Sequence, residues 1–151
     1  MITYQVEQYN SAIDEMKELY LDHWEEIAGD KDIIKLNPNY ELYTQMAKLG
    51  FIHLVTVRDE ECLVGYHLSL VYPHMHYKDS LTAFTDIFFL KKEYRKGRIG
   101  INLFKYMEHS LRAKGVQKIY MGTKLKHDIG NLLERLGYTP IERLYTKILK
   151  E

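Results

Sequence analysis

The residues best suited to chemistry lie in one basic turn, Glu93–Gly100, between a predicted strand and a predicted helix. A helix start leaves backbone N–H groups without intrahelical partners and carries about half a positive charge, so phosphates bind there readily. Gly97 and Gly100 would let the backbone approach such a ligand closely. Five cations within eight residues would add attraction: Lys91, Lys92, Arg95, Lys96 and Arg98. The turn predicts a pyrophosphate or another polyanion as ligand, although a solvated connection that merely starts a helix has a similar composition.

Three titratable side chains upstream of the turn are the next candidates. Asp86 stands in an apolar stretch, Ala83–Phe89, where burying a carboxylate is costly unless it has a function or a buried donor as partner. A histidine of the preceding loop could be that donor. His74 and His76 lie in this loop, and histidine titrates near neutral pH. Their H-x-H spacing also occurs in metal sites, but no third ligand is evident.

The spacing of apolar residues predicts the elements that position these groups. In chain order they are a strand Ile2–Glu7, a helix between Ser11 (N-cap) and Gly29, a helix from Asn37-Pro38 to Gly50, strands Phe51–Val57 and Cys62–Tyr72, a loop Pro73–Ser80, a strand Leu81–Leu90, a helix Arg98–Lys114, a strand Lys118–Thr123, a helix Asp128–Leu136 and a strand Ile141–Leu149. Trp24, Tyr40 and Tyr43 are expected to pack in the core, with a substrate-cleft wall as the alternative. This order predicts one α/β (α+β) domain over residues 1–151, with a mostly antiparallel sheet and parallel crossovers late in the chain.

Composition narrows the class of protein. The 151 residues are 46% hydrophobic and 28% charged, which suffices for one core. Lys+Arg and Asp+Glu are 21 each, so charge gives no argument for nucleic-acid or membrane binding. The single cysteine, Cys62, fits a reducing compartment, and no apolar run approaches the ~20 residues of a membrane span. Met1–Gln5 lacks the regions of a signal peptide, so a cytoplasmic location is expected.

The turn and a later segment resemble a known family. Phe88–Gly100 is similar to motif A of the GCN5-related N-acetyltransferases (GNAT), [QR]-x-x-G-x-[GA], with Arg95 and Gly100 at the outer positions and Arg98 in place of the middle glycine. Asn131–Tyr138 resembles the family's late L-Y-E-K-L-G-F segment, and the element order fits along essentially the whole chain. The P-H-x-H-Y loop is similar to loops of phage and prophage members, for which the target could be a host component in the host cytoplasm.

The resemblance implies a GNAT fold, with about four helices around a sheet that splays between central strands. It implies acetyl-coenzyme A as cosubstrate, bound in that cleft. The backbone of Phe88, Phe89 and Leu90 would pair with the pantetheine arm. The pyrophosphate would be held by the amides of Arg95, Lys96, Gly97, Arg98, Ile99 and Gly100. Asn131 or its neighbours could touch the cofactor as it leaves the cleft.

The reaction implied is direct attack of a neutral amine on the thioester in a ternary complex. Family members often carry a carboxylate on the strand before motif A, so Asp86 is the expected base, directly or through water. His74 and His76 are further candidates for proton transfer, or they could shape the loop or bind substrate. The family's usual general acid, a tyrosine, is replaced here by Leu133. The alternatives are Tyr138, Tyr145, His127 and water.

The function expected is N-acetylation of a primary amine on a small molecule, a lysine side chain or a protein N-terminus. A GNAT-like interaction protein with little or no activity is the main rival, because Leu133 and Arg98 depart from the family's pattern. A histidine–metal hydrolase would rest on His74 and His76 alone. A homodimer through the Tyr138–Leu149 edge would be similar to dimers in the family.

Overall fold

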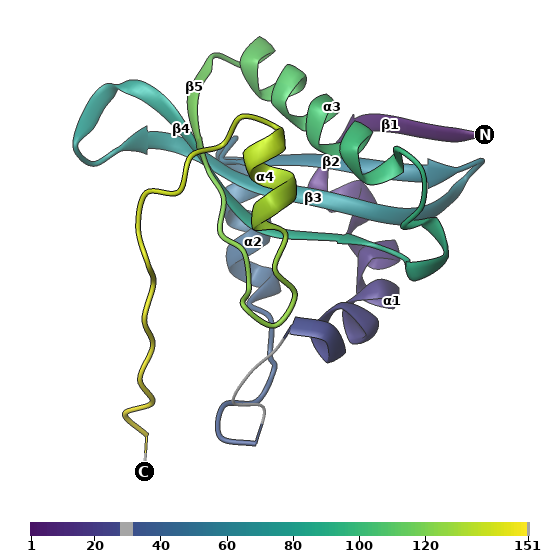
Figure 1. Cartoon of the computed structure of the whole chain (residues 1–151), viewed down its shortest axis with the longest axis horizontal. Helices are drawn as coiled ribbons and strands as arrows, with labels where there is room; N and C mark the ends of the chain where they lie inside the picture. Colours follow the sequence, from purple (N-terminus) through teal and green to yellow (C-terminus); the bar gives the residue numbers. More distant parts are fainter. Residues whose placement is uncertain (28–31, 151) are drawn as a thin grey trace.

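A five-stranded sheet forms the centre of the computed structural model, which describes residues 1–27 and 32–150 (Figure 1). Its strands, in spatial and chain order, are β1 (Ile2–Glu7), β2 (Ile52–Asp59), β3 (Cys62–His74), β4 (Tyr77–Leu90) and β5 (Val116–Tyr120). The first four strands pair antiparallel, whereas β4 and β5 are parallel. The expectation of a mixed, mostly antiparallel sheet is therefore confirmed.

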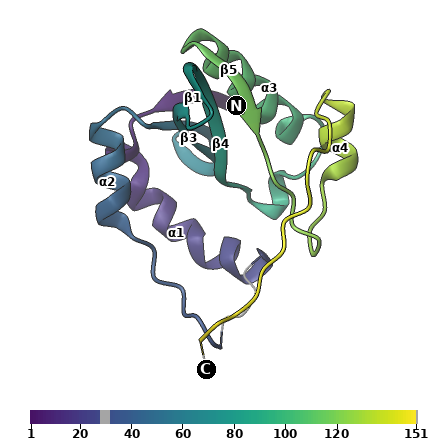
Figure 2. The ribbon, with the colours of Figure 1, turned by 90° about the vertical axis from the view of Figure 1, so that its left-hand side faces the viewer.

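Helices cover both faces of the sheet (Figure 2). They are α1 (Tyr9–Ile27), α2 (Tyr40–Lys48), α3 (Ile99–Ala113) and α4 (Gly130–Arg135). On one face, Met16 and Tyr20 of α1 are buried in a cluster with Tyr66 of β3. On the other face, Leu103 and Met107 of α3 lie in a second buried cluster with residues of β2, β3 and β4. The two clusters give each apolar side of the sheet a helical layer.

The parallel strands β4 and β5 separate where a cofactor cleft is expected. Their paired residues run from Leu81 opposite Val116 to Phe84 opposite Tyr120. Beyond that last pair, β4 continues to Leu90 while β5 has ended. In the described structure, the β5-facing edge of β4 is therefore left without a strand partner from Thr85 onward.

The predicted loop Pro73–Ser80 is wrong. Strand β3 continues to His74 and β4 begins at Tyr77, so a tight turn of Met75 and His76 joins them. The pairing jumps from Pro73 opposite Leu81 to His74 opposite Tyr77, which leaves 78–80 bulged out of the ladder. The histidines and the tyrosine at this end contact one another, and cross-strand aromatic pairs of this kind stabilise hairpins.

The predicted final strand Ile141–Leu149 is also wrong. Residues 139–150 form an extended arm outside every strand of the described structure, and the arm leads away from the sheet (Figure 1). A strand needs an edge to pair with, and the arm does not return to one. Leu144 is 94% exposed and Tyr145 is 83% exposed.

The other differences concern element ends. Helix α1 begins at Tyr9, so Ser11 is not its N-cap, and Gly29 lies outside the described residues. The N-cap of α2 is Asn39, whose side chain accepts a hydrogen bond from the Leu42 amide at 3.0 Å. None of the helices in the described ranges is both long and apolar enough to cross a membrane.

Candidate functional site

The basic turn between β4 and α3 presents unpaired backbone donors. A short 3-10 turn, Lys92–Tyr94, follows β4, and Gly97 then adopts φ +58°, a conformation that glycine reaches without steric cost. The first α-helical bond runs from the Asn102 amide to the Arg98 carbonyl at 2.8 Å. Within the described part of the chain, the amides of Gly97, Arg98 and Gly100 have no protein acceptor. They are available to a polyanion, whereas the amides of Arg95 and Ile99, also expected to hold one, donate to the carbonyls of Lys92 and Lys96.

Gly100 leaves open space over this helix start. A Cβ added there would have Leu90 Cδ2, at 3.9 Å, as its nearest neighbour, which is an ordinary van der Waals contact. Neither crowding nor a positive φ within the protein therefore requires glycine at this position. A ligand that lies close to the backbone would require it.

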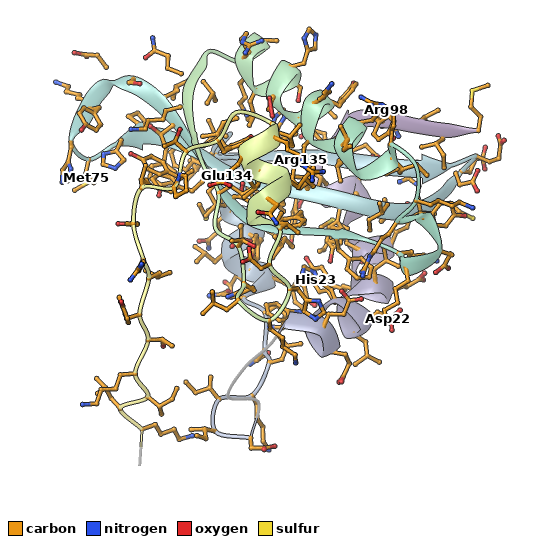
Figure 3. The ribbon with its side chains drawn as sticks, viewed as in Figure 1. Asp22, His23, Met75, Arg98, Glu134 and Arg135 are labelled. Atoms are coloured by element: carbon orange, nitrogen blue, oxygen red, sulfur yellow. The ribbon has the colours of Figure 1, made fainter. Side chains whose placement is uncertain are left out.

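The side chain of Arg95 is engaged with the protein itself. Its Nε donates to the Leu90 carbonyl at 2.6 Å, and its guanidinium pairs with Glu26 of α1 at 2.8 Å. Its amide donates to the Lys92 carbonyl at 3.1 Å. Arg95 thus fastens the turn to β4 and α1. The cations left at the turn include exposed Lys96 and Arg98, and Figure 3 shows Arg98 at the start of α3.

The strand end Phe88–Leu90 is held in place by aromatic packing on both faces of the sheet. Phe88 lies 5.4 Å from the ring of Phe104 on α3 and stacks on His67 at 5.9 Å. Phe89 is buried on the α1 side of the sheet. This packing fixes the backbone of β4 along its unpaired edge, where the pantetheine arm is expected.

Asp86 is the extra residue of a β-bulge. Thr85 pairs with Ser69 and Ile87 pairs with Leu68, so Asp86 has no partner on β3. A bulge re-aims side chains, and here two consecutive residues face the α1–α2 layer. Ile87 is buried in the α1-side core, and Asp86 accepts a hydrogen bond from the hydroxyl of Tyr43 on α2. The bulge therefore brings a carboxylate to the surface beside the opening between β4 and β5.

The surroundings of Asp86 suit a base. Desolvation by the protein around it raises the pKa of Asp86, and the hydrogen bond from Tyr43 lowers it in part. The same burial, together with Asp86, raises the pKa of Tyr43, so the phenol keeps its proton. Asp86 is nevertheless exposed to solvent, which leaves it within reach of a substrate. Its partner is a tyrosine, where the sequence pointed to a loop histidine.

The two loop histidines occupy the β3–β4 hairpin. The ring of His74 stacks on Phe84 at 5.9 Å and on Tyr120 at 6.0 Å, and its Nδ1 accepts the His76 amide at 3.0 Å. His76 lies in the turn beside Met75, which is at the opposite end of the molecule from Arg98 (Figure 3). Among the described hydrogen bonds, none joins Asp86 to either histidine.

The described residues contain no cluster of three or more His, Cys, Asp or Glu side chains that could hold a metal ion. His74 and His76 accordingly find no third ligand in this part of the chain.

The candidates for the general acid lie apart from one another. Leu133 is buried in α4, and the Tyr138 hydroxyl donates to Glu108 Oε1 of α3 at 3.3 Å. Tyr145 lies in the exposed arm, and His127 is exposed before α4. Asn131 is exposed on α4. Among the described hydrogen bonds, none joins Tyr138, Tyr145 or His127 to Asp86.

Sequence reasoning missed the bulge and the role of Tyr43. Tyr43 fits an ordinary helical stripe, and it does pack against the α1-side core beside Tyr9, at 5.6 Å. No local pattern marks it as the partner of a residue 43 positions away. Trp24 also packs against this core, as expected.

A cavity of about 470 Å³ lies elsewhere, between the ends of β1 and β2 and the helices α2 and α3. It is lined by His53, which hydrogen-bonds Ser110 at 2.8 Å, and contains neither Asp86 nor the basic turn. The candidate site is therefore assigned from the turn and the bulge.

Known proteins share the fold of this chain. The sequence model of the acetyltransferase (GNAT) family matches residues 13–138. Among solved structures, an acetyltransferase from Trypanosoma brucei is 16% identical, with a TM-score of 0.71 over 99% of this chain and 100% of that chain. A predicted acetyltransferase from Clostridium acetobutylicum, crystallised with acetyl-CoA, is 9% identical, with a TM-score of 0.69 over 99% and 97%. An aminoglycoside acetyltransferase from an uncultured soil metagenomic sample, in complex with sisomicin, is 12% identical, with a TM-score of 0.72 over 97% and 96%.

No curated protein sequence matches the chain significantly. At these identities the solved structures show a shared fold, and they give no support to a phage-type subgroup.

Proposed function

Because the chain belongs to the GNAT family of acetyltransferases, we propose that it acetylates a primary amine placed at Asp86, by direct attack in a ternary complex. Acetyl-coenzyme A is the cosubstrate of this family. The single observation that carries the proposal is the bulge, which presents Asp86 next to the point where β4 and β5 separate. The acceptor and its donor could meet there from opposite faces of the sheet.

The residues of the turn and of β4 fit the donor. The free amides of Gly97, Arg98 and Gly100 offer hydrogen bonds to a pyrophosphate at a positive helix end. Lys96 and Arg98 add charge, and the open edge of β4 offers backbone groups to an extended pantetheine arm. Arg95 positions the turn through Glu26 and Leu90.

The chemistry assigned to Asp86 is proton removal. The amine nitrogen forms a bond to the thioester carbonyl carbon, the carbon–sulfur bond breaks, and the amine proton passes to Asp86, directly or through water. Coenzyme A leaves as a thiolate and takes a proton from water, since Leu133 offers none. A raised pKa makes Asp86 a stronger base than an ordinary carboxylate. The stacking of His74 on Phe84, two residues before Asp86, supports a role for His74 in contacting the acceptor.

Calorimetric titration with acetyl-coenzyme A, with ATP as control ligand, tests the first half of this proposal. We expect saturable binding of acetyl-coenzyme A and none of ATP. Absence of binding would contradict the proposed acetyltransferase activity and favour an interaction protein with a GNAT fold.

The second half is tested by Asp86→Asn, compared with Asp79→Asn, an exposed carboxylate of the same strand. Asp86→Asn should keep the affinity for acetyl-coenzyme A and slow coenzyme A release about 100-fold or more, as loss of a general base does. Asp79→Asn should match the wild type. Full activity of Asp86→Asn would remove it from the mechanism.

The proposed acceptor is a class of molecules, the primary amines. The amine could belong to a small molecule, as in the soil enzyme crystallised with sisomicin, or to a protein lysine or N-terminus. One acetyltransferase domain over residues 1–151, working in the cytoplasm, fits the single exposed cysteine, Cys62.

A homodimer is also part of the proposal. Strand β5 pairs with β4 on one side, and its other edge is open in the described structure. The arm 139–150 is extended and exposes Ile141, Leu144, Tyr145 and Leu149. A second copy could receive this arm at its β5 edge, which would cover apolar side chains and pair free backbone groups.

A further inference from the structure

Three aromatic rings form a continuous row across the last three strands of the sheet. Tyr72 of β3 stacks on Phe84 of β4 at 5.3 Å and 18°, and Phe84 stacks on Tyr120 of β5 at 4.9 Å and 7°. We call Tyr72, Phe84 and Tyr120 the ring row. His74 extends it, with its ring 5.9 Å from Phe84 and 6.0 Å from Tyr120.

The ring row lies beside Asp86, on the same face of the sheet. Thr85 Oγ1 lies 3.4 Å from His67 Nε2, on the side of the sheet that α3 covers, so the residues before and after it, Phe84 and Asp86, face the opposite side. Phe84 and Tyr120 are also the last paired residues before β4 and β5 separate. If the nitrogen of an acceptor reaches Asp86 from this face, the rest of the acceptor molecule would therefore contact the ring row.

Burial in a core does not account for the ring row. All three rings are partly exposed, and none belongs to either buried core of the described residues or packs against one. Large aromatic side chains in the middle of a sheet usually belong to a core, because burying them stabilises the fold. Partly exposed rings beside a candidate base suggest a surface that a ligand covers.

The charges around the ring row point to an acceptor with one amine. Asp86 lies two residues from Phe84 on β4, and its single carboxylate can pair with one ammonium. The charged group on the rings themselves is a cation, Lys118, whose Nζ lies 5.0 Å from the Tyr120 ring centroid. A polycation would meet Lys118, whereas an aromatic ring would stack on Phe84 and Tyr120.

We infer that the acceptor is an arylalkylamine, a primary amine joined by a short chain to an aromatic ring. The ammonium binds at Asp86, gives its extra proton to water and then attacks as the neutral amine, while the aromatic ring stacks on the ring row. This inference rests on the proposed function, and the transfer step is the one described there.

Coenzyme A release with matched amines tests it. The amines are 2-phenylethylamine, its saturated analogue 2-cyclohexylethylamine, and the polycation kanamycin, each with saturating acetyl-coenzyme A. We expect kcat/KM to be about three- to tenfold higher for 2-phenylethylamine than for the cyclohexyl analogue, the size of one or two aromatic contacts, and lowest for kanamycin. Equal values for the two matched amines, or a preference for kanamycin, would overturn the inference and leave the acetyltransferase standing.

Variants locate the preference on the rings. Phe84→Leu and Tyr120→Leu should each reduce the preference for 2-phenylethylamine to near unity, with unchanged affinity for acetyl-coenzyme A as the check on folding. Tyr106→Leu is the matched control, because Tyr106 packs on Tyr4 at 6.1 Å on the α3 side. A preference that survives in both ring variants would place the acceptor elsewhere. Failure to bind acetyl-coenzyme A would instead refute the proposed function, and this inference with it.

Discussion

At the residue scale, we expect the pair of Asp86 and Tyr43 to set the pH at which the proposed site works. Their hydrogen bond stabilises the carboxylate and opposes the desolvation that raises the pKa of Asp86. Tyr43→Phe removes the hydrogen bond, so the pKa of Asp86 should rise further. The acidic limb of the kcat/KM profile should then move to higher pH, measured with one amine for both proteins. Tyr40→Phe is the control, because Tyr40 also lies on α2 and stacks on Tyr20, whereas the described hydrogen bond to Asp86 comes from Tyr43. An unmoved limb in Tyr43→Phe would mean that Asp86 does not titrate in catalysis.

Sequence reasoning reached one member of this pair. Asp86 is conspicuous because a carboxylate stands in an apolar strand, and that mismatch can be read without a structure. Tyr43 satisfies every rule of a packing stripe and so gives no such signal. Its contact with Asp86 depends on the bulge, which a periodic pattern cannot reveal because it changes the facing of a single residue.

At the element scale, the start of α3 should control affinity for acetyl-coenzyme A. Gly100→Asp would place a carboxylate over amides that are free for the pyrophosphate. Repulsion between these charges should weaken binding at least about tenfold in calorimetry. His109→Asp adds the same group on the same helix, about 14 Å further along its axis, and should bind as the wild type does. Equal affinities for the two variants would place the donor away from the turn.

The elements themselves follow from the sequence wherever periodicity is strong. Helix α3 lies within one residue of its predicted ends, with Leu103, Met107 and Leu111 buried as the stripe predicts. The sequence does not predict the end of the β3–β4 hairpin. Polar residues and a proline there are typical of a loop, although both strands continue through them. Its stability comes from contacts between rings of different strands, such as Tyr72 with Phe84, and these have no local signature.

At the scale of the whole molecule, buried histidines should make the fold sensitive to acid. Desolvation lowers the pKa of His23 and His53 to about 4 and that of His67 to about 3. Unfolded histidine has a pKa near 6.5, so between pH 6.5 and 4 the unfolded chain binds protons that the folded chain does not. The stabilisation is complete above pH 6.5 and is lost as pH falls through this window. We expect each histidine to contribute a loss of about 2 kcal/mol in unfolding free energy between pH 7 and pH 5.

Urea unfolding at the two pH values measures this loss, and NMR assigns it. Of the seven histidines, those three should keep constant ring signals from pH 7 to pH 5. Equal stability at both pH values, or ordinary titration of those three rings, would show that they are hydrated in the folded protein.

The arm 139–150 shows why a correct local pattern can mislead about the whole molecule. Ile141–Leu149 has the residues of a strand, and the chain supplies an open edge at β5, but the arm extends away from its own sheet. A sequence pattern indicates that a segment can pair as a strand. It does not indicate whether the partner strand belongs to the same chain or to a second copy. If a second copy does, sedimentation equilibrium should give a dimer, and Leu144→Asp should shift it to monomer by placing a charge in the apolar contact. Leu125→Asp, at a site also 94% exposed but in the loop before α4, should leave the dimer intact. A wild-type monomer at every concentration would contradict the dimer.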